Sequence, residues 1–244
     1  MYFELAHYYD GLMQNAEYEK RADYLISLFL AYGKMPSLLL DAACGTGTIS
    51  VLLSQKGVNE IIGVDVSENM LAVAVEKAKD KNILFLNQDL SELDLYGTVD
   101  GVVCTLDSVN HITSKAKLLK IFKRISLFME PGALFIFDVN TVYKHKYVLG
   151  NNTFVFDDDE VFCCWQNFYK DKSKTVDICL DFFKKDGDSY QRSSEYFTEK
   201  AYTDSELKKI ILESGLETVN VFADLTMSKP GPRCQRKVYV VRKV

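Results

Sequence analysis

Short apolar runs alternate with amphipathic segments between residues 38 and 139. The apolar runs cover residues 38–42, 61–65, 83–86, 99–104 and 134–139. Between them, apolar residues recur at helical spacing, and Ser67 and Ser114 each stand at the start of such a segment, where a hydroxyl can cap a helix. Strands that alternate with helices are typical of a parallel sheet covered on both faces. The pattern therefore predicts a doubly wound α/β fold.

The pattern changes after Val139. Residues 153–156, 161–169, 175–183 and 190–197 alternate polar with apolar positions or are rich in aromatic and β-branched residues, and polar segments separate them. We expect an inserted antiparallel sheet over residues 151–200, with Asp186-Gly187 as its clearest hairpin turn. Residues 1–150 and 201–244 then form the main domain. In that domain, Thr203 and Glu206 predict a capping box, and residues 216–223 and 237–242 predict two closing strands.

Composition narrows the function classes. The chain has 244 residues, of which 48% are hydrophobic and 26% charged, as in ordinary globular proteins. Its net charge of -5 argues against a nucleic-acid partner, because no overall positive field attracts phosphates. The sequence has no apolar stretch long enough for a membrane helix, and its start lacks the features of a signal peptide. We therefore expect a cytoplasmic protein.

No metal site is predicted from the sequence. The six cysteines lack zinc-site spacing, so we interpret them as reduced thiols, several of them in the core. The acidic run at residues 157–160 lacks the ordered spacing of a calcium loop and is interpreted as a solvated turn.

A glycine-containing loop follows the first predicted strand. Residues 41–47 read Asp-Ala-Ala-Cys-Gly-Thr-Gly, a small-residue turn that lets a ligand approach the backbone and a helix N-terminus. The dinucleotide pattern G-x-G-x-x-G is not met, because Ser50 stands at its third glycine position. Asp65 ends the second strand, where an acid can accept hydrogen bonds from ribose hydroxyls, and Asp89 follows the third. Each acid alone has a structural explanation, but together they predict one ligand crevice.

These segments resemble the motifs of the class I S-adenosylmethionine (SAM)-dependent methyltransferases. DAACGTG resembles the first motif, GVDVSENML the second, NQDL the third and VDGVVCTLDSVNHI the fourth, while FMEPGALFIFDVN resembles the helix, turn and fifth strand that follow. The similarity is dense over about residues 36–140. Ala43 stands where glycine is commoner in the family. The resemblance implies a Rossmann-like sheet whose last strand is antiparallel.

The resemblance also implies cofactor-binding roles. Asp41 and the loop from Ala43 through Cys44 and Gly45 to Gly47 would hold the amino-acid part of SAM, and Asp65 the ribose. Asp89 and Leu90 would lie at the adenine amine. Met70 would lie on the adenine face or, equally well, pack in the core. The remaining cofactor positions that the resemblance implies are Val66, Leu106 and Tyr9; Tyr9 belongs to a leading Tyr-Asp element and would contact the cofactor or pack on the sheet.

Candidate acceptor residues follow the fourth strand and lie in the insertion. Asp107 and His111 are four residues apart and would share a helical face, so His111 is either a general base or a structural histidine. The aromatic insertion resembles the small sheet that some sugar and amino-group N-methyltransferases place over the acceptor. Its candidate substrate contacts are Trp165, Tyr169 and Tyr196, although the same aromatics could pack on the main domain or on a second copy in a homodimer.

We therefore expect transfer of a methyl group from SAM to N or O of a small-molecule acceptor, with S-adenosylhomocysteine (SAH) as product. The alternatives are an RNA or protein methyltransferase, an NAD-binding oxidoreductase and a non-catalytic cofactor-binding protein. Glycine spacing disfavours NAD, and the lack of a basic patch disfavours RNA.

Overall fold

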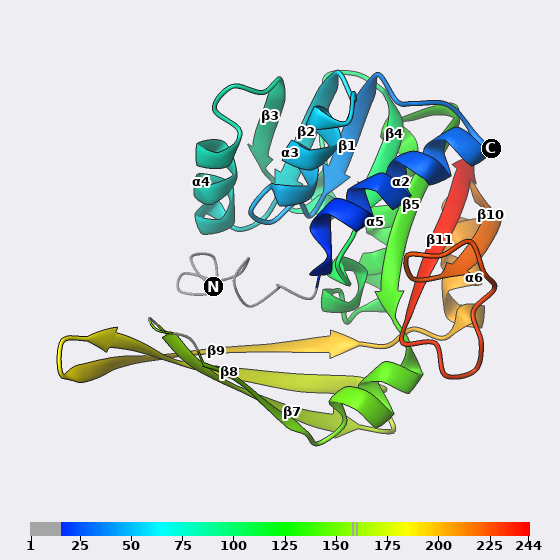
Figure 1. Cartoon of the computed structure of the whole chain (residues 1–244). Coiled ribbons are helices and arrows are strands. Elements are labelled where there is room, and N and C mark those ends of the chain that lie inside the picture. Colours follow the sequence, from blue (N-terminus) through cyan, green and yellow to red (C-terminus); the bar gives the residue numbers. More distant parts are fainter. Residues whose placement is uncertain (1–15, 158, 160) are drawn as a thin grey trace.

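A seven-stranded sheet forms the centre of the computed structural model, which describes residues 16–157, 159 and 161–244 (Figure 1). The strand order is β10-β11-β5-β4-β1-β2-β3. All neighbouring pairs are parallel except those of β11, which is antiparallel to both β5 and β10. The strands are β1 (Leu38–Ala42), β2 (Glu60–Asp65), β3 (Ile83–Asn87), β4 (Val99–Cys104), β5 (Met129–Asn140), β10 (Leu216–Ala223) and β11 (Arg236–Lys243). The predicted doubly wound sheet with an antiparallel last strand is confirmed.

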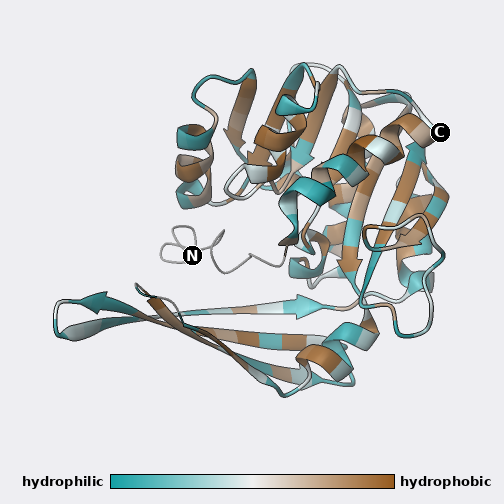
Figure 2. Cartoon of the chain, viewed as in Figure 1, coloured by the Kyte–Doolittle hydropathy of each residue, from teal (hydrophilic) through white to brown (hydrophobic). Residues whose placement is uncertain are grey.

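Helices cover both faces of this sheet. Apolar residues of α2 (Tyr18–Tyr32) and α3 (Thr48–Gln55) pack on one face, and those of α5 (Lys115–Phe128) and α6 (Asp204–Glu213) on the other. Helix α4 (Glu68–Lys77) lies beside β3 at the edge of the sheet (Figure 1). The strands of the main sheet are the most continuously hydrophobic part of the chain (Figure 2), as expected for a sheet buried on both faces. No helix among the described residues combines the length and apolarity needed to cross a membrane.

Capping side chains fix where the helices begin. Ser67 and Ser114 accept hydrogen bonds from the backbone N–H groups of Met70 and Lys117. Thr203 and Glu206 form the predicted capping box at α6. The largest boundary difference from the prediction is at β5: α5 ends at Phe128, and Met129 already pairs with Val99, so β5 begins earlier than residue 134.

A second sheet of four strands connects β5 to α6. It contains β6 (Thr153–Asp157), β7 (Val161–Lys170), β8 (Thr175–Asp186) and β9 (Ser189–Lys200), which are antiparallel in sequence order. Figure 1 shows this sheet beyond the carboxyl ends of the main strands. Its inward residues, among them Cys163, Ile178 and Phe182, form a core cluster with Met70 of α4. The second sheet is thus packed against α4 of the main domain.

Besides η2 (Leu90–Glu92), a 3₁₀ turn after β3, two further short helical turns were not predicted. A 3₁₀ turn, η3 (Ser108–His111), follows β4, and a π-helical turn, η4 (Lys144–Leu149), leads from β5 into the second sheet. π-Helical turns are rare and often occur at functional sites. Both turns contribute residues to the cavities described next.

Candidate active site

The loop after β1 has a left-handed backbone at three positions, two of which are glycines. Ala43, Gly45 and Gly47 have φ values of 61°, 54° and 72°, in the region that favours glycine. A Cβ on Gly47 would lie 2.8 Å from the Cβ of Ala74, so a larger residue would push α3 away from α4. At Gly45 no atom lies within 4 Å of such a Cβ, because this residue faces a cavity. The loop therefore exposes backbone directly to a ligand space.

Asp65 at the end of β2 is oriented by backbone donors. Its carboxylate accepts hydrogen bonds from Gly45 N at 2.9 Å and Ser67 N at 2.8 Å. Burial raises the pKa of Asp65, although these backbone donors favour its ionised form. Each carboxylate oxygen can accept a second hydrogen bond, so Asp65 can hold two neighbouring hydroxyl groups.

A cavity of about 250 Å³ opens in front of this loop. Carboxylates of Asp65 and Asp89 line it at points along an otherwise mainly apolar wall, and Lys117 pairs with Asp89 at 2.8 Å. The apolar lining includes Val66, Met70, Leu90, Ile112 and Ile121. An apolar slot with a hydroxyl-binding carboxylate and a close backbone loop fits the adenosine part of a nucleoside cofactor. We call this space the cofactor cavity.

A second cavity of about 580 Å³ adjoins the first. The two cavities share five lining residues, which are Leu106, Asp107, Phe156, Trp165 and Glu199. Phe156 and Trp165 belong to the second sheet, so this sheet forms part of both walls. We call the second space the acceptor cavity and the five shared residues the junction.

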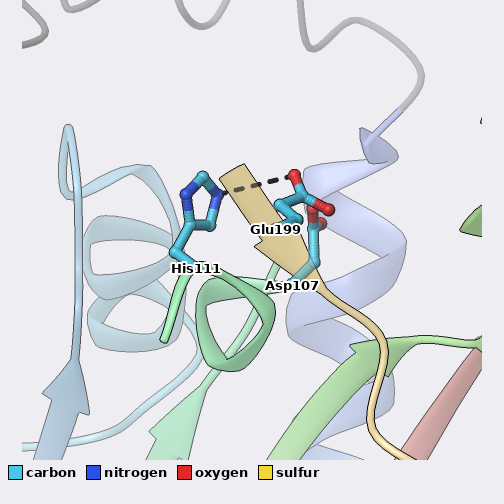
Figure 3. Close-up of side chains that lie close together, drawn as sticks. All are labelled: Asp107, His111 and Glu199. Carbon is cyan, nitrogen blue, oxygen red and sulfur yellow. Dashed lines mark ion pairs between the residues drawn. The ribbon is translucent and has the colours of Figure 1, made fainter. Parts of the chain in front are cut away.

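Three titratable side chains meet beside the junction (Figure 3). Ligating atoms of Asp107, His111 and Glu199 all lie within 4.8 Å of one another, and His111 Nε2 is 3.7 Å from Glu199 Oε1. The His111 ring stacks on Phe197, with ring centroids 5.1 Å apart. His111 comes from η3 and Glu199 from the end of β9, so distant parts of the chain form the group.

A strained turn holds Asp107 in place. Leu106 and Asp107 both have left-handed backbones, with φ values of 57° and 56°, which non-glycine residues rarely adopt. Their N–H groups donate to the carboxylate of buried Asp138, at 2.8 and 2.7 Å. Arg236 of β11 pairs with both Asp138 and Asp107. Asp138 and Arg236 therefore stabilise the turn that places Leu106 and Asp107 at the junction.

Glu199 is held by a buried histidine. His145 Nε2 lies 3.0 Å from Glu199 Oε2, and its Nδ1 has no hydrogen-bond partner in the described chain. An unpartnered buried N–H would be costly, so we assign the neutral tautomer in which Nε2–H donates to Glu199. Burial alone would raise the pKa of Glu199, but the hydrogen bond from His145 and the nearby His111 and Lys144 hold it well below its usual value. Glu199 is therefore an ionised acceptor at the junction.

Comparisons with known proteins agree with this geometry. Residues 39–132 match a family model described as a methyltransferase domain. The Bacillus subtilis (strain 168) protein YqeM, which carries a methyltransferase name, is 31% identical over 245 residues that cover 100% of this chain and 97% of YqeM. The chain belongs to the class I SAM-dependent methyltransferases.

Solved structures show the same fold. A SAM-dependent methyltransferase from Clostridium acetobutylicum ATCC 824 has a TM-score of 0.90 and 33% identity, with 99% of this chain and 98% of that chain covered. CalS10, an amino pentose methyltransferase from Micromonospora echinaspora solved with SAM bound, has a TM-score of 0.78 and 17% identity, with 97% and 96% covered. SAM is the methyl donor of this family, so the expected cofactor is confirmed.

Most of the predicted cofactor residues of this methyltransferase line the cofactor cavity. They are Ala43, Gly45, Asp65, Val66, Met70, Asp89, Leu90 and Leu106. Asp41, Cys44 and Gly47 lie outside this lining, and Tyr9 lies outside the described residues. Asp41 is buried and hydrogen-bonded to Ser50, and burial raises its pKa to about 6. Both interpretations of Met70 hold, because it lines the cavity and also packs in a core cluster.

The predicted acceptor residues are more scattered in the methyltransferase fold. His111 and Asp107 line the cofactor cavity, and Trp165 lies at the junction. Tyr169 and Tyr196 lie outside the lining of both cavities. Tyr196 is 63% exposed because it stands opposite Cys179 on the outward face of the second sheet. Position along an aromatic run does not say which face of a strand a side chain takes.

Several polar residues of the site were missed from the sequence. They include Asn140, Lys144, His145, Glu199 and Arg236, of which only Asn140 lies in a segment that resembles the family, at the end of its fifth strand. One signal was available for Glu199: it follows Glu195 and Phe197 at every second position of β9, and this alternation marks the inward face.

Proposed function

We propose that this methyltransferase transfers a methyl group to N or O of a small molecule bound in the acceptor cavity. The observation that carries the proposal is the junction, where an apolar cofactor cavity opens into a polar second cavity beside three titratable side chains. The fold neighbour CalS10 is an amino pentose methyltransferase, which supports an acceptor of this size. We further propose that residues 151–200 form an inserted unit that covers the acceptor.

The residues at the junction have distinct proposed roles. SAM supplies an electrophilic methyl group, and alignment of the acceptor with that group provides much of the rate. Leu106, Phe156 and Trp165 restrict the acceptor's approach and exclude water. Glu199 and Asp107 accept hydrogen bonds from the acceptor's amine or hydroxyl. His111 is 33% exposed at its side chain, and we assign it as the base that takes up the acceptor's proton.

The group of Asp107, His111 and Glu199 has the spacing of a metal site, yet its charges are already engaged. Arg236 pairs with Asp107 at 2.6 Å, and His145 donates to Glu199. We therefore assign these carboxylates to acceptor binding. The homodimer through residues 151–200 stays a prediction, which sedimentation of the purified protein tests.

A fractionated methylation assay tests the proposal. The protein is incubated with methyl-labelled SAM and a cell extract separated into small molecules, RNA and protein. We expect label in the small-molecule fraction only, and none with Asp65→Ala, which lacks the hydroxyl-binding carboxylate. Label confined to RNA or protein would overturn the proposal and support the alternative acceptors.

A further inference from the structure

Three acids line the acceptor cavity, and two of them are paired with arginines. Asp224 pairs with Arg21 at 2.8 Å, and Asp107 pairs with Arg236 at 2.6 Å. Glu199 accepts a hydrogen bond from neutral His145 and stays ionised. The two acids paired with arginines need no further cation from the protein.

Two cations on the same cavity have no such partner. Lys144 Nζ donates to the neutral amide oxygen of Asn140 at 2.9 Å and forms no ion pair with a described carboxylate. Arg233 stands exposed in the loop before β11, lines the same cavity, and likewise has no ion-pair partner within the described ranges. Surface cations without partners are common, but Lys144 is partly buried.

Burial makes the position of Lys144 costly. Removal from water lowers the pKa of its ammonium group, even though Asp107 and Glu199 lie near enough to favour the charge. A partly buried ammonium bound only to an amide gains most from a second, anionic partner. Arg233 provides planar, two-pronged donors that suit carboxylate or phosphate oxygens. Together they line a space that an anionic group could occupy.

We propose that the acceptor carries an anionic group, carboxylate or phosphate, bound by Lys144 and Arg233. This inference rests on the proposed function and names the class of its substrate. The reacting amine or hydroxyl lies at the junction beside Glu199, and the anion lies farther into the acceptor cavity. The acceptor is thus polar at both ends, such as an amino acid or a phosphorylated amino alcohol or amino sugar. An amine without an anionic group would lack the contact with Lys144 and Arg233.

Anion binding to the SAH complex tests the inference without a known acceptor. Inorganic phosphate and sodium acetate are titrated calorimetrically at constant ionic strength, so that the two sources of negative charge are compared. We expect at least one of them to bind, and the double variant Lys144→Gln/Arg233→Gln to bind it at least about tenfold more weakly, because two charge-assisted contacts are lost. The double variant Lys123→Gln/Lys208→Gln, which removes the same charge from exposed helix positions, should bind the anion as the parent protein does.

Three outcomes would overturn the inference. The first is that neither anion binds the parent protein, and the second is that the Lys144/Arg233 variant binds as tightly as the parent. The third is that this variant loses SAH affinity in parallel, since the two cations would then bind the cofactor's own carboxylate. Folding of each variant is checked by its unfolding midpoint.

Paired acceptors separate this inference from the proposed function. Methyl transfer to 2-aminoethanol and to 2-aminoethyl phosphate is compared, as is transfer to 3-aminopropanol and to β-alanine. Preference for the charged member of either pair supports the inference. Equal transfer to both members would refute the inference and leave a small-molecule acceptor intact, whereas anion binding with label found only in RNA or protein would refute the proposed function instead.

Discussion

The two cavities are built in different ways. The cofactor cavity depends on a backbone loop and on Asp65 and Asp89, which lie close to their own strands in sequence. The acceptor cavity depends on side chains from α2, β5, η4, β9 and β11, and a buried network of charges holds several of them. The cofactor cavity is thus encoded locally, while the proposed acceptor site depends on the finished fold. Substitutions should separate the two: one set changes SAH affinity and the other changes stability.

The largest expected effect lies on the acceptor side. Arg236→Ala leaves Asp107 and nearly inaccessible Asp138 without their main cation, and removal of one partner from a buried ion pair typically costs about 3–5 kcal/mol. We expect the free energy of unfolding in urea to fall by about that amount. Lys209→Ala is the control, because this exposed lysine has only a 3.7 Å ion pair with Glu213 on the helix surface and should cost less than about 1 kcal/mol. Equal losses for both variants would mean that the buried network is unimportant.

The second-largest effect is expected at Asp65, the carboxylate proposed to bind the cofactor's ribose. Asp65→Ala removes two hydroxyl acceptors and frees Gly45 N, so we expect the Kd for SAH to rise about 100-fold or more, at about 1.5–3 kcal/mol for each charged hydrogen bond. Asp65→Asn retains one acceptor oxygen and should lose less affinity for SAH. Calorimetric titration with SAH measures both. An unchanged Kd for Asp65→Ala would remove Asp65 from the cofactor site.

A pH effect of about tenfold is expected from Asp41. Burial raises the pKa of this carboxyl to about 6, and the family resemblance assigns it to the cofactor's amino-acid part. The ammonium of SAH favours ionised Asp41, so SAH affinity should fall about tenfold between pH 7 and pH 5 as the carboxyl is protonated. Binding near pH 6 should release a proton, which titrations in two buffers of different ionisation enthalpy detect. Asp41→Asn should abolish both effects, and a flat profile in the parent protein would exclude this role.

The raised pKa of Asp41 also affects the stability of the protein without cofactor, and there its pH dependence runs in the opposite direction. A carboxyl with a raised pKa in the folded state binds protons more tightly there, so its stabilising contribution is fully present below its unfolded pKa of about 3.9. This contribution is lost as pH rises through about 6. Cofactor affinity and this part of the stability should therefore change in opposite directions with pH.

The smallest expected effect lies outside both cavities. Thr203→Ala removes the side-chain cap of α6 and should cost about 1 kcal/mol of unfolding free energy. SAH affinity should stay within about twofold, because α6 contributes no residue to the lining of the cofactor cavity. A large change in SAH affinity would show that the two regions are coupled through the sheet.

The same contrast governs what could be predicted from the sequence. The caps Ser67, Ser114 and Thr203 act within one helical turn, and the acids at 65 and 89 follow their own strands, so local pattern was sufficient. Glu199 and Lys144 reach the site through long-range packing of β9 and η4, which local pattern does not determine. Tyr196 shows the same limit, since its strand was predicted correctly but its face was not.

The place of β11 in the sheet has a consequence for the order of assembly. This strand lies between β5 and β10, although it follows both in the chain. While a ribosome still holds the segment Arg236–Lys243, the nascent chain already contains the whole cofactor loop. At that stage β5 has an open edge, and Asp107 lacks the guanidinium of Arg236. Open edges are templates for aggregation. The emerging protein could therefore bind SAM before it can select an acceptor, and early cofactor binding would stabilise it through this interval.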